Sequence, residues 1–417
     1  MAELPTYPLA RDPEHPLDPP PEYRELRASA SLTRVRAWDG STPWLITRYE
    51  DARHALTDRR LTMDVTSPGF PHTSPSSRLR GQGAVFFPSR PEERYAAGRA
   101  MMIREFTPLR MAELRPFVQR VADGEIDAML AGPRPADLVE AFALPFAIKV
   151  ICEFLGVPVA DRGRLHELSR VLGSRTAPAE RVASARSEMD AYFRALVADP
   201  GDGLMGRIVR ARVETGELSE ADAAADFQGL FFTGHGPTAY MIATGVVALL
   251  RHPEQIEVLT GTDDETVHAT AVQELLRYVT VSHNARQRAA TDDIEIGETL
   301  IRRGEGVLIQ IDSANRDETV FPDPDRLDLR RTPSRRHVAL GLGVHHCTGH
   351  ALADIELDVA YTTLFRRLPD LRLAVDFANV PFKFDENLVG VHALPVTWGS
   401  GAKHRDQTSS VPRVTSR

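Results

Sequence analysis

Cysteine is scarce in this chain. Its 417 residues include two, Cys152 and Cys347, which lie 195 positions apart. Two thiols at that distance do not form the disulfide framework of a small secreted scaffold, so we expect a reducing, cytoplasmic environment. A basic stretch followed by an apolar run is also missing from the start. Residues 1–21 hold seven prolines instead, which predicts an extended lead-in and no signal peptide.

An excess of positive charge is absent as well. Lys and Arg number 50 and Asp and Glu 58, and this net charge of −8 argues against nucleic acid or an anionic membrane as the main partner. The best candidate for a membrane span, Phe227–Leu250, lacks Asp, Glu, Lys and Arg. Its three threonines, four glycines, His235 and Pro237 are costly in lipid, so we predict a helix buried in a large domain.

What is present is an ordinary globular composition, with 42% hydrophobic and 26% charged residues. Helical periodicity covers nearly all of residues 92–278 and returns over 349–367, while short strand-like pieces lie in a predicted hairpin at 31–46 and between the helical stretches. Residues 62–90, rich in Ser, Pro and Gly, indicate a long functional loop. Residues 399–417 are expected to be a disordered tail. The predicted fold class is mainly α with minor β.

The strongest helical pattern, residues 219–250, contains an unusual segment in its middle. Ser219 and Asp222 resemble an N-cap pair at its start, and Thr233-Gly234-His235-Gly236-Pro237-Thr238 lies inside it. Pro237 has no N–H to donate to the Thr233 carbonyl, so we predict a break in the helical hydrogen bonding. Because a break in a central helix must be compensated, it points to a function.

The most distinctive local feature surrounds the second cysteine, in Leu340-Gly341-Leu342-Gly343-Val344-His345-His346-Cys347-Thr348-Gly349-His350. A dinucleotide-binding loop is a weak interpretation, because His346 replaces the third glycine of Gly-x-Gly-x-x-Gly. Zinc ligation by His346, Cys347 and His350 lacks the usual paired cysteines. A buried structural cysteine between turn glycines is a third interpretation. The fourth is a thiolate ligand to haem iron, stabilised by free backbone N–H groups at a helix start.

On these residues the chain resembles the cytochrome P450 family, over about residues 22–398. The family's cysteine motif is matched, with Leu340 in place of its phenylalanine, by Gly341, Gly343, His345, Cys347 and Gly349. Glu274-Leu275-Leu276-Arg277 matches the family's Glu-x-x-Arg helix motif, and Phe321–Arg326 matches the segment after it. Arg288–Ile294 fits the segment whose arginine binds a haem propionate.

The resemblance implies one large domain, with a helix-rich part and a small sheet-rich part, that binds haem b through the Cys347 thiolate. It places Tyr95, Arg99 and Arg288 at the haem propionates. It also implies an ion network that holds the cysteine loop, formed by Glu274, Arg277 and Arg326. Electrons are expected from a ferredoxin and its reductase, with a docking surface provided by Arg330, Arg331, Arg335 and Arg336.

The chain departs from the family at the oxygen-binding bend, Thr233-Gly234-His235-Gly236-Pro237. Gly236 and Pro237 stand where the family has a carboxylate and an alcohol, so neither relays a proton, and Thr238 lies about 100° further round the helix. His235 is expected to face a neighbouring helix. Three consequences stay open: proton delivery organised by the substrate's own polar groups, turnover with peroxide, or a product of coupling, ring closure or desaturation.

The resemblance also implies a substrate pocket lined by Phe86, Phe87, Leu230, Thr233, Val281, His283, Asn284, Leu388 and Val389. The polar members of this set favour a polar or aromatic small molecule. We therefore predict a haem-thiolate oxidoreductase that uses O2 to tailor a specialised metabolite, such as an antibiotic. The alternatives are a peroxide-driven peroxygenase and a non-catalytic haem or recruitment domain.

Overall fold

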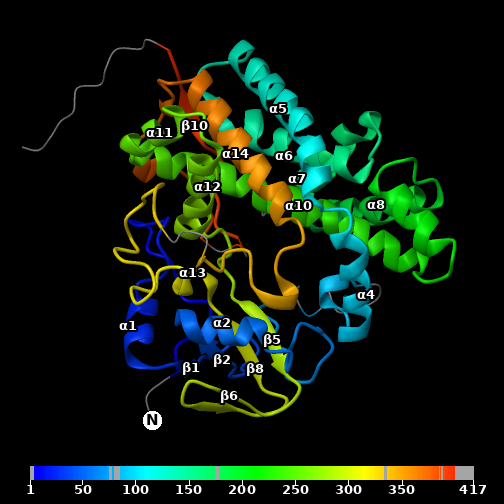
Figure 1. The fold of residues 1–417 in the computed structure, drawn as a ribbon, viewed down its shortest axis with the longest axis vertical. Helices are drawn as coiled ribbons and strands as arrows, with labels where there is room; N and C mark the ends of the chain where they lie inside the picture. The colour runs from blue at the N-terminus through cyan, green and yellow to red at the C-terminus, as the bar shows by residue number, and fades with distance from the viewer. Residues whose placement is uncertain are drawn as a thin grey trace, which may run out of the picture.

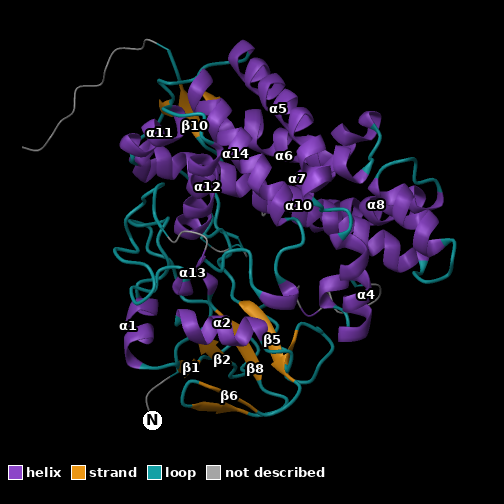
Figure 2. Ribbon diagram, viewed as in Figure 1, coloured by secondary structure: helices purple, strands orange, loops and turns teal. Residues whose placement is uncertain are grey.

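The computed structural model describes residues 4–74, 78, 85–173, 178–332, 336–384, 386 and 388–399. Helices fill most of the molecule, and the largest sheet lies at one end (Figures 1 and 2). The predicted fold class, mainly α with minor β, is confirmed. Most of the predicted tail, residues 400–417, lies outside the described residues. Within the part of the chain that the structure describes, every helix is too short or too polar to cross a bilayer.

One long helix, α10 (Glu220–Arg251), runs through the helix-rich part (Figure 1). The Ser219 hydroxyl caps it by accepting the Asp222 N–H at 3.1 Å, as the sequence predicts. Its second half is apolar on all sides, which is typical of a helix surrounded by protein. It packs against α6 (Leu144–Leu155), α8 (Ala179–Ala198), α12 (Glu265–Val279) and α14 (His350–Arg367).

The predicted break in α10 is wrong, because the helix continues through Pro237 to Arg251. Packing holds the helix on both sides of the missing hydrogen bond. Gly234 lies so close to α6 that a Cβ there would stand 2.5 Å from Ile151 Cδ1. The Thr238 hydroxyl also donates to the Gly234 carbonyl at 3.0 Å, which adds a bond beside the gap. Pro237 itself has no N–H for the carbonyl one turn earlier.

The helical periodicity predicted over residues 92–278 and 349–367 corresponds to observed helices, and α14 begins within one residue of the predicted start. The other helices are α1 (Glu22–Ser29), α2 (Tyr49–Thr57), α4 (Glu92–Ile103), α5 (Pro108–Ala131), α7 (Arg162–Gly173), α9 (Leu204–Ile208), α11 (Pro253–Thr260) and α13 (Ile311–Ala314). Many of the side chains that build the site lie on α4, α7, α12 and α14.

The largest sheet has five strands in the order β1-β2-β8-β5-β3. They are β1 (Leu32–Arg34), β2 (Trp44–Ile46), β8 (Gly306–Ile309), β5 (Arg286–Ala290) and β3 (Leu61–Thr62). The predicted hairpin at 31–46 is confirmed, since β1 pairs antiparallel with β2 and Gly40 turns between them with a φ of 81°. A smaller sheet joins β4 (Ala136–Asp137), β10 (Pro395–Thr397) and β9 (Arg372–Leu373), and β6 (Ile294–Ile296) forms a hairpin with β7 (Thr299–Ile301).

The proline-rich lead-in packs into the sheet-rich part and is not a separate arm. Buried Arg11 pairs with buried Asp312, with Nη2 and Oδ2 2.6 Å apart. The Tyr7 hydroxyl donates to Gln310 and accepts the Ala285 N–H at 2.6 Å. Composition predicted an extended backbone here but did not reveal these contacts, because the partners lie about three hundred positions later in the sequence.

Candidate active site

Two glycines shape the segment before Cys347. Gly341 and Gly343 have φ values of 73° and 69°, in the left-handed region that other residues rarely adopt. The Cys347 N–H then donates to the Leu340 carbonyl at 2.8 Å and closes the loop. As a result, the Cys347 thiol lies directly before α14, where the Gly349 N–H donates to the sulfur.

The two cysteines have different environments. Burial raises the pKa of the Cys347 thiol, while the Gly349 N–H and the Arg286 and Arg99 guanidiniums act to lower it. Cys152 is fully buried in α6, and burial raises its pKa to about 12. Cys347 is therefore the thiol with neighbours that stabilise a thiolate. Cys152 is a core residue, as predicted.

Positive charge gathers beside Cys347 without a matching carboxylate. Arg288 of β5 is 2% exposed, and among the described residues no Asp or Glu pairs with it. Burial lowers its pKa to about 9. Arg286 lies two residues earlier, on the same face of the strand, and burial lowers its pKa as well. Because a buried guanidinium without an anion is costly, this face of β5 fits an anionic ligand.

Helix α4 brings two further predicted residues to the same place. The Tyr95 hydroxyl donates to the Val344 carbonyl, and its ring lies 4.2 Å from the His345 ring. Arg99 donates to the His346 carbonyl at 2.8 Å. The His345 Nδ1 is buried without a hydrogen-bond partner among the described residues, and burial lowers the His345 pKa to about 3. A nitrogen in this position can bond to the same anionic ligand.

These groups fit haem. They offer a thiol ahead of a helix as an iron ligand, and cations with an unsatisfied imidazole nitrogen for two propionates. The zinc interpretation fits less well, since no group of three His, Cys, Asp or Glu in the described ranges is placed to hold a metal ion. His346 and His350 instead contact each other edge to face, with ring centroids 4.8 Å apart.

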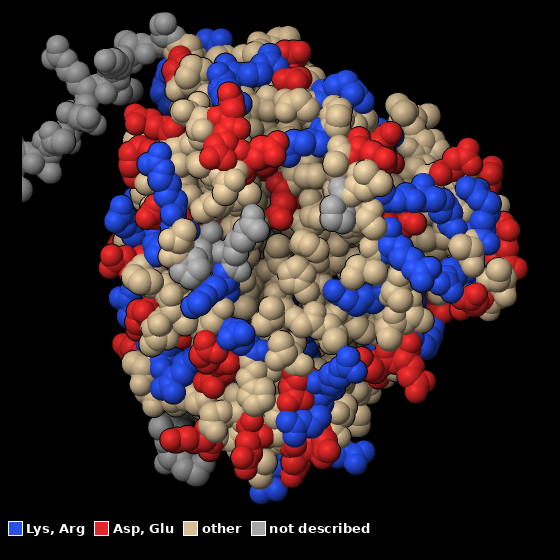
Figure 3. Space-filling view, viewed as in Figure 1, with Lys and Arg blue, Asp and Glu red and all other residues tan. Residues whose placement is uncertain are grey.

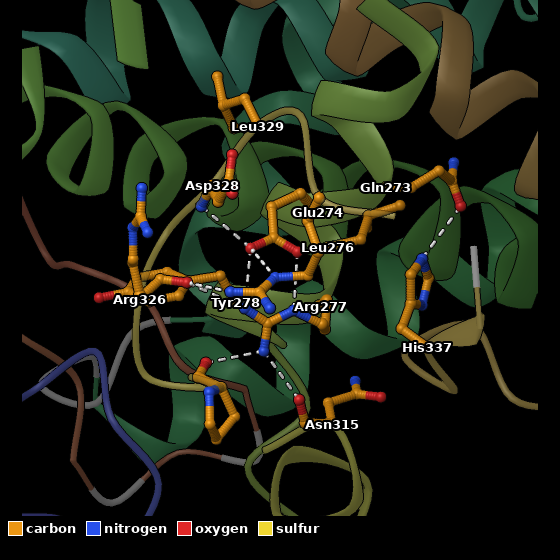
Figure 4. A network of polar contacts seen from close by, with 12 residues as sticks. Gln273, Glu274, Leu276, Arg277, Tyr278, Asn315, Arg326, Asp328, Leu329 and His337 are labelled. Carbon is orange, nitrogen blue, oxygen red and sulfur yellow. Dashed lines mark hydrogen bonds and ion pairs between the residues drawn. The ribbon is translucent and has the colours of Figure 1, made fainter. Parts of the chain in front are cut away.

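Glu274 and Arg277 form a buried ion network (Figure 4). Arg277 Nε and Nη2 bind the Glu274 carboxylate at 2.7 and 2.8 Å. The second guanidinium comes from Arg331, whose Nε lies 3.0 Å from Glu274 Oε1. The prediction that Arg326 fills this role is wrong. Its side chain is exposed, and only its carbonyl oxygen accepts hydrogen bonds from the two buried arginines.

This network holds the cysteine loop through the backbone. Arg277 donates to the Asn315 carbonyl at 2.9 Å, and the Asn315 side chain accepts the Val338 N–H at 2.8 Å. The Val338 carbonyl in turn accepts the Gly341 N–H. Arg331 was predicted to lie on a docking surface, but it is buried in this network, so that prediction is also wrong.

The predicted oxygen-binding bend presents little polar chemistry of its own. The exposed Thr233 hydroxyl donates to the Gly229 carbonyl at 2.8 Å. A Cβ at Gly236 would meet no atom within 4 Å, so the helix faces open space there. His235 points to α7, as predicted: its Nδ1 donates to the Phe231 carbonyl, and its Nε2 lies 2.6 Å from Ser169 Oγ. Burial lowers the His235 pKa to about 4.

An acid and an alcohol do meet nearby, in a pair that sequence reasoning missed. Thr238 Oγ1 lies 3.5 Å from Oε2 of Glu356, a residue of α14 that is 1% exposed. Glu356 Oε1 has no hydrogen-bond partner among the described residues, and burial raises the pKa of this carboxyl. Thr238 was set aside because of its angle on the helix. Nothing in the local sequence shows that Glu356, on another helix, approaches it.

The structure brings some of the predicted pocket residues together. The Val389 N–H donates to the Val281 carbonyl at 2.7 Å, and Leu388 forms an antiparallel β-bridge with Ser282. The two segments are therefore adjacent. Leu230 lies on α10. The Phe86 ring packs against the preceding residue of that helix, Gly229.

Two polar members of the predicted pocket have other partners. His283 Nδ1 accepts a hydrogen bond from Arg11 at 3.1 Å, so this side of its ring is used by the contact with the lead-in. The Asn284 side-chain amide lies 3.4 Å from the Thr73 hydroxyl. Phe87 is buried between α4 and α10.

The comparisons with known proteins agree with this geometry. The family model described as "Cytochrome P450" matches residues 202–376. Cytochrome P450 GfsF of Streptomyces halstedii is 41% identical over 401 residues, which cover 95% of this chain and 97% of that protein. Its crystal structure superposes with a TM-score of 0.91, covering 94% of this chain and 100% of that one. The chain belongs to the cytochrome P450 family. It is therefore a P450 oxidoreductase that binds haem through a cysteine thiolate.

Two other relatives are similar to this cytochrome P450 along most of its length. Pentalenic acid synthase of Streptomyces avermitilis is 40% identical over 387 residues, covering 92% of this chain and 95% of that protein. The structure of SgvP, a putative thioether synthase in the tailoring step of griseoviridin, superposes with a TM-score of 0.86 at 34% identity and covers 95% of this chain and 100% of that one. Relatives of this P450 thus act in secondary metabolism.

Proposed function

We propose that this P450 catalyses an oxidative tailoring step on a specialised metabolite, with Cys347 as the axial ligand of haem b. The observation that carries the proposal is the gathering of buried cations around the cysteine segment: Arg286 acts on Cys347, and Arg288, which has no carboxylate partner among the described residues, acts on His345, whose Nδ1 has no hydrogen-bond partner there either. Tyr95, Arg99, Arg288 and His345 would hold the propionates of a bound haem by charged and neutral hydrogen bonds. Pentalenic acid synthase and SgvP, whose names refer to such metabolites, support the substrate class.

Haem with a thiolate ligand activates oxygen, and sulfur donation favours O–O cleavage. The chain's own residues supply the rest. The Gly349 N–H and the Arg99 guanidinium stabilise the negative charge on the Cys347 sulfur. Gly236 leaves open space beside α10, which would give a substrate or oxygen room there. The substrate lies against Leu230 and against the paired segments that contain Val281 and Val389.

Proton delivery does not need the acid and alcohol that Gly236 and Pro237 lack. Burial raises the pKa of Glu356, which favours the protonated form of its carboxyl. The Thr238 hydroxyl donates to the Gly234 carbonyl at 3.0 Å and also faces Glu356 Oε2 at 3.5 Å, so it can relay a proton between that carboxyl and α10. A water at the free Thr233 carbonyl completes a path toward the substrate. Polar groups of the substrate are the second candidate source.

Electrons come from a ferredoxin with its reductase. The exposed residues of the predicted docking surface are Arg330 and Arg336, whereas Arg335 lies outside the described residues. On the face seen in Figure 3, basic and acidic side chains are interspersed around an uncharged centre. This pattern favours a partner whose own acidic and basic groups match the mixed charges. It does not match a partner that needs a uniformly basic docking surface. The alternative is a peroxygenase, favoured by the loss of the acid–alcohol pair at Gly236 and Pro237.

The test of this function uses the ferrous–CO spectrum and two donor systems. Cys347→Ser is expected to lose the thiolate-type Soret band, whereas Cys152→Ser, which changes a core thiol, keeps it. An unchanged band in Cys347→Ser overturns the ligand assignment. Turnover with O2, ferredoxin and reductase supports the monooxygenase or oxidase. Turnover with hydrogen peroxide alone, at the same rate, identifies a peroxygenase instead. Loading with haem but no turnover by either route identifies a non-catalytic domain.

A further inference from the structure

The loop before α4 is tied to α10 by a buried ion pair. Arg90 is 4% exposed and Asp226 is fully buried. They meet through two contacts, Nη2 to Oδ1 at 2.7 Å and Nη1 to Oδ2 at 3.2 Å. Asp226 Oδ1 also accepts the Phe87 N–H at 2.9 Å. One carboxylate of α10 therefore holds both a side chain and the backbone at the end of this loop.

The other Arg90 donors are also used. Nε donates to the Val85 carbonyl at 2.7 Å, and Nη2 donates to the Asp222 carbonyl at 3.1 Å. All three guanidinium nitrogens thus have acceptors, from the loop and from α10. A buried charge that is paired and hydrogen-bonded in this way fixes the relative position of the two segments.

This ion pair stands next to a wall of the substrate pocket. Gly229 follows Asp226 by one turn of α10, and a Cβ there would lie 2.4 Å from Phe86 Cγ. The Phe86 ring is therefore seated directly on the helix backbone. Leu230 and Thr233 follow Asp226 by four and seven residues, so they share its face of the helix. The position of Phe86 on this face sets how much of the pocket is open.

The same loop end also reaches the cysteine segment. Phe87 packs against Gly98 of α4, where a Cβ would stand 2.8 Å from the Phe87 Cβ. Its ring stacks on Tyr95 with centroids 6.1 Å apart and planes 10° apart. Tyr95 in turn contacts His345. The backbone bond from Phe87 to Asp226 thus anchors a row of rings that ends beside Cys347.

We propose that Arg90 and Asp226 are positioning residues that set the width of the substrate pocket by fixing Phe86 against Gly229. They fix the end of the loop against α10. The row of rings formed by Phe87, Tyr95 and His345 then keeps this loop end in a fixed position relative to the cysteine segment. The inference rests on the proposed function in one respect, that residues on this face of α10 line the pocket.

The experiment compares two haem ligands of different size, imidazole and 4-phenylimidazole, by absorbance titration. Asp226→Asn removes the charge and widens the pocket, so the ratio of the 4-phenylimidazole Kd to the imidazole Kd falls about tenfold. Gly229→Ala keeps the ion pair but pushes the Phe86 ring into the pocket, so the ratio rises. Trypsin cleavage after the exposed Arg78, in the same loop, accelerates in Asp226→Asn only.

The matched control is the neighbouring ion pair between Arg94 of α4 and Asp222 of α10, at 2.6 Å, in which Arg94 is 58% exposed. Arg94→Gln removes this exposed pair, leaves Asp222 beside Arg90, and should leave both the ligand ratio and the cleavage rate unchanged. If Asp226→Asn behaves like Arg94→Gln in both measurements, the inference is overturned. If Asp226→Asn does not fold, an unchanged ratio in Gly229→Ala overturns it. Failure of the proposed function is seen separately, as a wild-type protein without the thiolate-type CO band.

Discussion

Thr238 Oγ1 of α10 and Glu356 Oε2 of α14 lie 3.5 Å apart at the point where the two helices pack, one residue beyond Pro237. An alcohol and an acid are thus present in the helix core, although neither stands at the position that the family pattern assigns to it. The acid comes from the helix that begins just after Cys347. Burial raises the pKa of the Glu356 carboxyl, which favours its protonated form, and the proposed proton path through this pair can be tested.

Thr238→Val and Glu356→Gln are therefore expected to uncouple electron use from product formation. General acid contributions are large, so we expect product per electron to fall about tenfold, with peroxide released instead. The matched control is Thr244→Val, which removes another hydroxyl that bonds to an α10 carbonyl one turn back. Unchanged coupling in both variants would show that Glu356 has a structural role alone.

A substrate analogue distinguishes proton delivery by Glu356 from proton delivery by the substrate's own polar groups. If Glu356 delivers the proton, an analogue stripped of its hydroxyl or carboxyl keeps tight coupling in the wild type. If it instead wastes electrons as peroxide, the substrate organises the protons. Product per electron, measured for both compounds in the wild type and in Gly236→Asp/Pro237→Thr, decides between these sources.

Arg331 and Arg326 should differ sharply in importance. Arg331→Met leaves the buried Glu274 with one cation fewer, and breaking a buried pair costs about 3–5 kcal/mol, so little haem-loaded protein is expected. Glu274→Ala should have a similar effect. Arg326→Ala keeps the carbonyl that the network uses and should load haem normally. Absorbance at the Soret band relative to protein measures loading, and equal loss in Arg326→Ala would contradict this assignment.

Acid should destabilise the fold partly through His235. Burial lowers its pKa from 6.5 to about 4, so the folded state favours the neutral ring, which lies between Ser169 and the Phe231 carbonyl. The unfolded state binds a proton first, and stability present above pH 6.5 is lost as the pH falls toward 4. We expect about 3 kcal/mol from this residue.

Urea unfolding between pH 7.5 and pH 4.5 (about the range of this titration) checks that expectation. His235→Gln should flatten the acid limb, while His54→Gln, on the exposed side of α2, should not. Other buried histidines with lowered pKa values, His283, His337 and His345, keep part of the slope. An identical slope in His235→Gln and the wild type would contradict this role.

Local sequence patterns predicted the elements whose causes are local. The cap at Ser219, the turn at Gly40 and the glycines before Cys347 each follow from one residue's conformational preference, and all are found. The pattern failed where a partner comes from far along the chain. Arg331 reaches Glu274 across 57 positions, and Glu356 reaches Thr238 across 118, so no window of sequence contains either pair.

The break predicted at Pro237 failed for a related reason. A proline removes one hydrogen bond, and the local pattern records that loss. What keeps the helix continuous is its contact with Ile151, on another helix, which the local pattern does not include. The partner of His283 was missed for the same reason, since the Arg11 that binds it lies 272 positions earlier.

The contacts of the lead-in impose an order on folding. Arg11 meets Asp312 across 301 positions, and β2 pairs in parallel with β8, so the central sheet cannot close before most of the chain has left the ribosome. The cost of closing such large loops must be met before these contacts stabilise anything. Cys347 follows β8 in the chain, and α14, which packs against α5 and α10, follows Cys347. The surroundings of Cys347 are therefore completed only when strands and helices from both ends of the polypeptide have met there.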